Sequence, residues 1–504
     1  MKRGLLWSAI TVLITTAGSL AVTPALIHHL GAAEYGLYVL VLVMASYAGF
    51  MDFGLTWAST RYFARDLAEN RHADLVSRFR TLQICLGLVG LASALFALTL
   101  GPSLLHASGI GQGRDVITVL LLAASSFALV LQGQLHASLL RADQRFEETG
   151  KIAALAGALL PLATVVVIWA APRLFWLLLA NALVNVAVLF VYTRANRNLL
   201  TGGLWRFNFR YLRQMASFSG WSTVSRLVMT FILQVDRLAV ALIGTVSGLT
   251  YYSVPANLAS RVNVLGGPVA GMFFARASFL FAAGDELELR RQHARATRFL
   301  LWAVPALSLP LIILGKRFLS VWIGPEMATR GTPILIAFTI GYLINSVTSI
   351  DAVLIEASGR ASWTAMNMLV FFFPALAVVL IFSRQWGAQA VGFAAAGWLA
   401  AVGITNMVLR GRLLPNRLGT AWAGCLAAAL PSVFIGYMAQ RSLSNTIQVL
   451  ASMAAIGALA LATGFFTTLN ADDRAICVNS VLRRTRTPLP AGELEKTNEC
   501  IGRN

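Results

Sequence analysis

Four arginines inside apolar segments are the residues whose chemistry stands out in this chain. Arg226, Arg237, Arg261 and Arg276 lie within or at the end of runs apolar enough to cross a membrane. A guanidinium group is permanently charged, and its donors match the oxygens of a phosphate in pairs. A charge facing lipid is costly, so such residues normally face a water-filled cavity or a partner group. They predict either a buried anion site or a structural ion pair.

Four apolar stretches also carry polar side chains along one helical face, given a rotation of about 100° per residue. Such stripes line a cavity or let helices pack closely through small hydroxyl groups. Two acidic residues in them, Asp52 and Asp236, are the candidates for carrying a coupling ion. The stripes are Ser222, Arg226, Thr230, Asp236 and Arg237; Ser253, Asn257, Ser260 and Arg261; Ser8, Thr11, Thr15, Ser19 and Thr23; and Asp52, Thr56, Ser59 and Thr60.

The excess of arginine over carboxylate in these stripes predicts a positive cavity that suits an anionic substrate such as a diphosphate. We expect Arg226, Arg237, Arg261 and Asn257 to bind it. Arg65 and Arg276 are expected at the cytoplasmic mouth of the cavity, where they either catch a phosphate or simply anchor their helices. No metal and no cofactor are expected, since the four cysteines show no ligand spacing.

The composition of the chain predicts which secondary-structure elements position these groups. The 504 residues are 57% hydrophobic and only 12% charged, whereas soluble proteins are about 25% charged. We expect an all-α polytopic membrane protein with about 14 transmembrane helices, because helices satisfy their own backbone amides in hydrocarbon. The apolar stretches are 4–28, 36–60, 81–105, 115–138, 152–170, 174–193, 217–243, 251–275, 299–322, 333–355, 364–383, 389–408, 421–439 and 447–468.

The net charge of +19 comes from 40 Lys+Arg against 21 Asp+Glu. In a soluble protein this excess would point to a nucleic-acid partner. Here most of the basic residues fall in alternate connections and at both ends of the chain, which is typical of the cytoplasmic side of a membrane protein. We therefore expect both termini in the cytoplasm and no nucleic-acid partner. The first apolar run is too long for a signal peptide and is read as a retained span.

A repeated order of short motifs indicates a duplication. Trp7-Ser8 and Phe63-Ala64-Arg65 frame the first two spans, and Trp221-Ser222 and Phe274-Ala275-Arg276 frame the seventh and eighth. Both copies begin on the same side of the membrane, so the halves are parallel, with a cavity between them. We expect six-helix lobes at 1–214 and 215–410, two further helices at 411–468 and a cytoplasmic tail at 469–504.

The stretch Leu30-Gly31-Ala32-Ala33-Glu34-Tyr35-Gly36-Leu37-Tyr38, followed by Asp52-Phe53-Gly54-Leu55 and Arg61-Tyr62-Phe63-Ala64-Arg65, carries a family resemblance. It resembles the N-terminal signature of polysaccharide (O-antigen type) flippases of the multidrug/oligosaccharidyl-lipid/polysaccharide exporter superfamily. The resemblance in span number and duplicated lobes extends over about residues 4–468, and the motif itself over residues 30–65.

The resemblance implies two six-helix lobes around a central cavity. It also implies flipping of an undecaprenyl-diphosphate-linked oligosaccharide across the bacterial inner membrane, for surface polysaccharide such as lipopolysaccharide O-antigen. The implied partners are this lipid-linked oligosaccharide, the bilayer, a polysaccharide polymerase and glycosyltransferases. In such flippases, arginines that line the cavity are thought to hold the diphosphate. The resemblance implies this role for Arg226, Arg237 and Arg261.

Three alternatives stay open beside alternating-access flipping. A cation-coupled drug antiporter of the same superfamily would favour a cavity rich in carboxylates, and this one is rich in arginine. A peptidoglycan-precursor flippase has the same span number and a basic cavity, and the pattern from Leu30 to Arg65 weighs against it. A membrane polymerase or glycosyltransferase would need a large loop with catalytic groups, which the short outer connections do not offer. We therefore do not expect an enzyme.

Overall fold

The computed structural model describes residues 2–48, 55–107, 114–171, 173–201, 208–211, 235–242, 246–415, 418–440 and 445–475. Nearly all of these residues are helical, and no strand occurs among them. The expected all-α membrane fold is confirmed. Its physical basis is that a helix pairs its own backbone amides where no water can do so.

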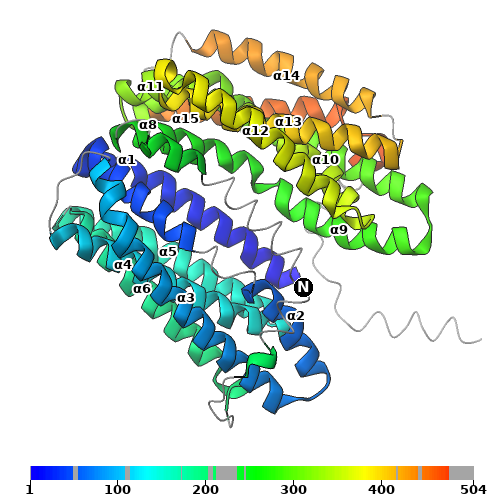
Figure 1. Ribbon diagram of the computed structural model, residues 1–504. Helices are drawn as coiled ribbons and strands as arrows, with labels where there is room; N and C mark the ends of the chain where they lie inside the picture. Colours follow the sequence, from blue (N-terminus) through cyan, green and yellow to red (C-terminus); the bar gives the residue numbers. More distant parts are fainter. Residues whose placement is uncertain are drawn as a thin grey trace, which may run out of the picture.

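The first six helices pack against one another and form what we call the N-terminal bundle (Figure 1). Its contacts run chiefly between α1 and α5, α3 and α4, and α4 and α6. Close packing of α1 on α5 needs a glycine at Gly157, because a Cβ there would lie 2.6 Å from Thr15 Cγ2. The helices are α1 (Lys2–Ala48), α2 (Leu55–Ala68), α3 (His72–Ala107), α4 (Arg114–Ala142), α5 (Phe146–Ala170) and α6 (Leu174–Ala195), followed by the short 3-10 helix η2 (Arg197–Leu199).

The remaining helices form the C-terminal bundle, in which α11 packs on α10 and α13, and α15 packs on α10 and α14. The two bundles meet where α1 lies beside α8 (Figure 1). The elements are α8 (Val246–Ser260), the 3-10 helix η3 (Arg261–Val264), α9 (Gly266–Ala283), α10 (Glu286–Trp322), α11 (Pro325–Ala357), α12 (Ala361–Trp386), α13 (Ala388–Leu413), α14 (Gly419–Ala439) and α15 (Thr446–Thr467).

Eleven helices among the described residues are long and apolar enough to span a membrane, against about 14 expected. The stretch 4–28 and the part of 36–60 up to Ala48 are two helical arms counted together as α1, which meet at a non-helical Gly31 (φ 81°, ψ 165°), and residues 55–60 belong to α2. The stretch 217–243 is described only from residue 235. The boundary expected after residue 214 also lies outside the described residues.

The expectation of one helix over 251–275 is wrong, because α8 ends at Ser260 and α9 starts at Gly266, with η3 between them. Tertiary packing explains the break. A Cβ on Gly266 would lie 2.7 Å from Ser346 Oγ of α11 and 2.8 Å from Asn263 Oδ1. The chain therefore presses its backbone against α11 at this point, which a side chain would prevent.

Four matching turns support the parallel repeat. Asn70 (φ 52°) between α2 and α3 corresponds to Gly284 (φ 70°) between α9 and α10. Gln144 (φ 59°) between α4 and α5 corresponds to Gly359 (φ 81°) between α11 and α12. The last two turns share one backbone pattern, in which the amide of the next residue, Arg145 or Arg360, bonds a carbonyl five residues back. Each pair is separated by about 214 residues, the spacing that also separates Trp7 from Trp221.

Candidate functional site

A cavity of about 350 Å³ lies between the two bundles. Its walls come from α1 and α5 of the N-terminal bundle and from α8, η3 and the end of α10 in the C-terminal bundle. Most of the lining is apolar, and the polar groups are few. They are Thr15, Ser19, Thr23, Thr164, Asn257 and Arg261, with the tyrosines Tyr35 and Tyr38.

Arg261 is the charged group in this lining. It opens η3, and its half-buried guanidinium reaches across to α1. Nη2 donates to Ser19 Oγ at 3.2 Å and Nη1 to Thr16 Oγ1 at 3.5 Å. No carboxylate pairs with Arg261 among the residues that the structure describes. Two hydroxyl groups leave its positive charge uncompensated, so the cavity is suited to an anion.

A second arginine lies directly behind the cavity wall. Arg237 Nη2 donates to Asn257 Oδ1 at 2.7 Å, and Asn257 lines the cavity one helical turn before Arg261. Asp236 bonds elsewhere: its Oδ2 accepts from Tyr252 at 2.6 Å and its Oδ1 from the backbone amide of Arg237 at 2.7 Å. The structure thus brings Arg237, Asn257 and Arg261 to one side of the cavity.

Two further hydrogen bonds join the bundles, in addition to those of Arg261. Trp322 of α10 lines it, and its Nε1 donates to the carbonyl of Leu20 at 3.0 Å. Thr250 of α8 donates to the carbonyl of Ala32, just past the kink in α1. Both acceptors are α1 backbone atoms, so a movement of the bundles relative to each other breaks or remakes both bonds.

The hydroxyl stripe on α1 has two roles in the structure. Thr11 Oγ1 contacts the carbonyl of Gly150, and Thr15 packs against Gly157, so these two residues serve the packing of α1 on α5. Ser19 instead bonds Arg261, together with Thr16, which the stripe did not include. Polar residues of α1 therefore serve both the packing of helices and the lining of the cavity.

Of the four remaining expected site residues, the two that the structure describes, Arg65 and Arg276, are not part of the central lining. Arg65 is exposed near the end of α2 and bonds Glu69 Oε1 at 2.9 Å, which holds the pKa of the Glu69 carboxyl below its usual range. Arg276 is exposed on α9, at a second cavity on the C-terminal bundle. Arg226 and Asp52 lie outside the described residues. A role in substrate or ion binding for these four residues stays a prediction.

Arginines outside the cavity bond carboxylates in several places. Arg78 of α3 is buried, with Nε 2.9 Å and Nη2 3.3 Å from the two oxygens of Asp66. Its guanidinium also lies over the rings of Tyr62 and Tyr211, 4.8 Å and 4.5 Å from their centroids. This pair could not be predicted from the sequence, because Arg78 lies between the apolar stretches 36–60 and 81–105, where a topological role explains a positive charge.

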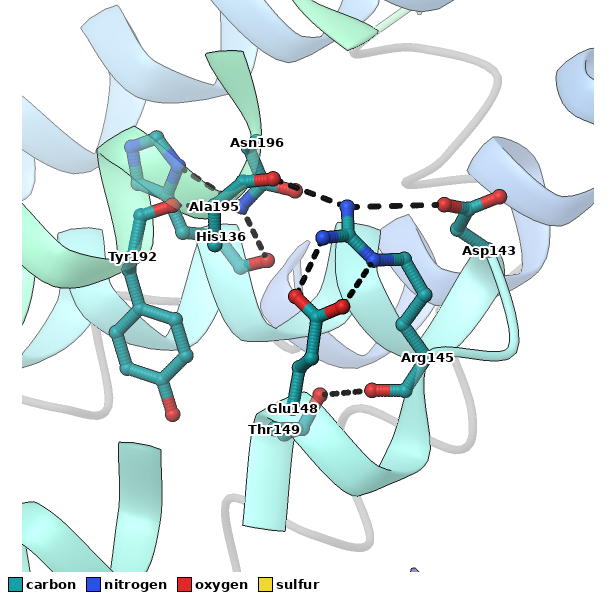
Figure 2. Close-up of polar contacts among 8 residues, drawn as sticks. All are labelled: His136, Asp143, Arg145, Glu148, Thr149, Tyr192, Ala195 and Asn196. Atoms are coloured by element: carbon teal, nitrogen blue, oxygen red, sulfur yellow. Dashed lines mark hydrogen bonds and ion pairs between the residues drawn. The ribbon is translucent and has the colours of Figure 1, made fainter. Parts of the chain in front are cut away.

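A further paired arginine lies where α4, α5 and α6 meet, and Figure 2 shows its contacts. Arg145 bonds both carboxylate oxygens of Glu148 and lies 3.9 Å from Asp143. Its Nη1 also donates to the carbonyl of Ala195 at 2.9 Å, at the C-terminal end of α6. This arginine ties three helices together, whereas Arg261 bonds only hydroxyl groups among the described residues.

The sequence model of one protein family, described as "Polysaccharide biosynthesis protein", matches residues 28–326. The chain belongs to this family. The match includes the kink of α1, all of the described cavity wall from α5 and α8, and Arg261. It ends just beyond Trp322.

Two relatives extend the comparison. The chain is 22% identical over 365 residues to the "Putative O-antigen transporter" of Shigella flexneri, covering 71% of this chain and 85% of that one. It is 28% identical over 162 residues to the "Uncharacterized membrane protein EpsK" of Bacillus subtilis (strain 168), covering 32% of this chain and 30% of that one.

Solved structures share the fold at low sequence identity. The lipid II flippase MurJ in an inward closed conformation superposes with a TM-score of 0.72 at 13% identity, over 91% of this chain and 98% of that one. An inward-facing multidrug resistance MATE family transporter of the MOP superfamily gives 0.64 at 12% identity, over 81% and 98%. The chain is therefore a multi-pass membrane protein with the fold of these transporters.

Proposed function

We propose that the protein is a flippase that moves an undecaprenyl-diphosphate-linked oligosaccharide from the cytoplasmic to the periplasmic leaflet of the bacterial inner membrane. The family and the relative from Shigella flexneri support a transporter for surface polysaccharide. The protein acts by binding and conformational change and makes no covalent bond. Its partners are the lipid-linked oligosaccharide, the bilayer, and the polymerase and glycosyltransferases of the same route.

The observation that carries the proposal is the half-buried guanidinium of Arg261 in a cavity between two bundles, where none of the described carboxylates pairs with it. A diphosphate offers oxygen pairs that fit it, and Asn257 with Arg237 behind it adds a second cationic position. A cavity of about 350 Å³ accommodates a headgroup, while the polyprenyl chain stays in lipid and the sugar extends toward the opening.

The contacts between the bundles support transport by alternating access. Arginine-rich connections place both termini in the cytoplasm, so the α1 kink and the start of α8 are external. The bond from Thr250 to Ala32 therefore joins the bundles on the external side. Breaking it, together with the Trp322–Leu20 bond, opens the cavity outward. Asp236, beside Arg237, is a candidate carrier for a coupling cation, and Asp52 is a second.

Substitutions of the cavity arginines test the proposal. Arg226→Ala, Arg237→Ala and Arg261→Ala should each reduce export of surface polysaccharide and weaken binding of undecaprenyl diphosphate to the purified protein, while the protein still inserts. Arg330→Ala is the matched control, because Arg330 is exposed and pairs with Glu326 on α11, away from the cavity lining. Normal export and binding in all three cavity variants would overturn the proposal, and tight binding of a cationic drug in place of the diphosphate would support the antiporter alternative.

A further inference from the structure

A buried ionic cluster lies at the ends of α10, α11 and α13, remote in sequence from the central cavity lining. Asp351 Oδ1 accepts from His293 Nε2 at 2.7 Å and from Arg410 Nε at 3.1 Å. The three residues are 3%, 0% and 6% exposed, in the order Asp351, His293 and Arg410. An ionised carboxylate beside an arginine only accepts hydrogen bonds, so His293 carries its proton on Nε2.

The other ring nitrogen of His293 has no hydrogen-bond partner among the described residues. Nδ1 is buried, and in a neutral ring with its proton on Nε2 it presents a lone pair. The ring of Phe273, on α9, packs edge-on against the His293 ring with centroids 5.9 Å apart. Phe273 also lines a cavity of about 410 Å³ with Gln292, Arg276 and Arg295. A single aromatic side chain thus belongs to both the histidine site and that cavity.

The same positions of the N-terminal bundle are occupied without an ion pair. About 214 residues before the cluster lie Phe79 of α3, His136 of α4 and Asn196 at the end of α6. The Phe79 and His136 rings pack edge-on with centroids 4.9 Å apart. Figure 2 shows the bond in which Asn196 Nδ2 donates to the His136 carbonyl, at 3.1 Å. Corresponding helices therefore meet through the same three positions in both bundles, and the fold does not require charges there.

Burying charges that packing does not need is costly, which makes them candidates for function. We propose that His293 is a proton-binding site that couples the transport cycle to a proton gradient, an inference that rests on the proposed function. A hydronium ion transfers its proton to the Nδ1 lone pair and leaves as water, the Nε2 bond to Asp351 persists, and transfer of the proton back to water reverses the step. The cluster then changes from neutral to a charge of +1.

Protonation of His293 alters the electrostatic interactions with the charged groups around the ring. Asp351 faces it from α11 and Arg410 from α13, while α9 contributes Phe273, with Arg276 farther along the same helix. On α10 itself, Gln292 is adjacent and Arg295 bonds Asp473. A buried net charge of +1 favours a state in which α9 withdraws and water reaches the ring.

Helix α9 also connects the cluster to the central cavity. It begins at Gly266, directly after η3, which carries Arg261. The backbone of Gly266 lies against Ser346 of α11, about one turn and a half before Asp351 on the same helix. A shift of α9 against α11 on protonation therefore moves η3 and the Arg261 guanidinium, which is how proton binding would change the affinity for an anionic headgroup.

Three variants of the full-length protein test this inference. His293→Gln keeps a donor for Asp351 and removes the proton acceptor. The triple variant His293→Phe, Asp351→His, Arg410→Asn copies the N-terminal cluster into the C-terminal bundle. His136→Gln is the matched control. Protonation is followed by ¹⁵N resonances of labelled histidine in nanodiscs, and coupling by flipping of undecaprenyl-diphosphate-linked oligosaccharide in proteoliposomes with and without a pH gradient.

Among the resonances of the six histidines, we expect one pH-dependent signal that is present in the wild type and in His136→Gln to be absent from His293→Gln. The gradient should accelerate flipping at least tenfold in the wild type and His136→Gln, and less than twofold in His293→Gln and in the triple variant. Undecaprenyl diphosphate should bind His293→Gln within twofold of the wild-type affinity.

A gradient response that persists in His293→Gln would overturn the assignment of the proton to His293. A response that is lost in Asp236→Asn and kept in His293→Gln would assign the proton to Asp236 instead. If the triple variant does not insert, His293→Gln decides by itself. Failure of the wild type to bind undecaprenyl diphosphate would instead contradict the proposed function, and the ¹⁵N titration would still decide whether His293 binds a proton.

Discussion

Arg78 and Arg261 differ in the groups that surround their guanidinium charges in this membrane protein. Arg78, in the N-terminal bundle, has a carboxylate bonded to two of its nitrogens and an aromatic ring on each of two sides. Arg261, between the bundles, has two hydroxyl groups. Neutralised charge holds helices together, whereas charge left uncompensated next to a cavity is available to a ligand. The predictions below test this division.

The largest effect is expected on stability, from Asp66→Asn. The variant leaves Arg78 buried without its counter-charge, and removing one partner of a buried pair costs about 3–5 kcal/mol. Thermal or denaturant unfolding in detergent measures the loss. Adding Arg78→Met to Asp66→Asn should recover part of it, since the unpaired charge is gone. An Asp66→Asn protein as stable as the wild type would show that the pair does not hold the bundle.

Arg261→Ala should lower affinity for the ligand and leave stability nearly unchanged, in contrast to Asp66→Asn. Its unfolding free energy should fall by no more than about 1 kcal/mol, because the substitution breaks no ion pair among the described residues. Affinity for undecaprenyl diphosphate should fall by about 10- to 100-fold, from the loss of a charged hydrogen-bonding group. Isothermal titration and unfolding of the same sample separate the two quantities. A large loss of stability with unchanged affinity would reverse the roles assigned to Arg261 and Arg78.

A smaller effect should follow from removing the hydroxyl groups that orient Arg261. Thr16→Val with Ser19→Ala keeps the charge and frees the guanidinium to move, so affinity should fall by about threefold to tenfold, or about 1 kcal/mol. Thr11→Val is the control, because Thr11 bonds backbone carbonyls and does not bond Arg261. Equal effects from the control and the double variant would indicate that α1 packing, not orientation of Arg261, sets the affinity.

The smallest effect is expected from Arg65→Ala. Arg65 is exposed and its pair with Glu69 lies within one helical turn, where solvent screens the two charges, so the pair contributes little to stability. Binding and stability should both stay within error of the wild type, whereas the expected role of Arg65 at the cytoplasmic mouth would require slower export. Export assays that vary the level of expressed protein check this point.

Much of the fold could be predicted from the sequence because long apolar stretches specify membrane helices locally. Helices α3 to α6 and α10 to α15 occupy the stretches expected for them, although α10 begins at Glu286, well before residue 299. The break at η3 was missed for the opposite reason. It depends on the contact between Gly266 and Ser346, which belong to different helices.

Prediction of the site was limited in the same way. Helical periodicity places Asn257 and Arg261 on one face, and the structure puts both in the cavity lining. Periodicity cannot show that Thr16 of another helix bonds Arg261. The cluster of His293, Asp351 and Arg410 was missed because His293 and Arg410 fall outside the expected apolar stretches 299–322 and 389–408. Arg410 Nε and His293 Nε2 lie 3.1 Å and 2.7 Å from the same atom, Asp351 Oδ1, and this arrangement depends on tertiary packing.

The four matching turns have a consequence for how such a chain can diversify. Each joins neighbouring helices through a residue with positive φ, in bonds that close within a few residues. Helical hairpins of this kind can form as they leave the ribosome, before the two halves have met. None of the four turns lies in the wall of the central cavity, so substitutions in that wall leave these hairpins unchanged, and one scaffold can carry different cavity linings.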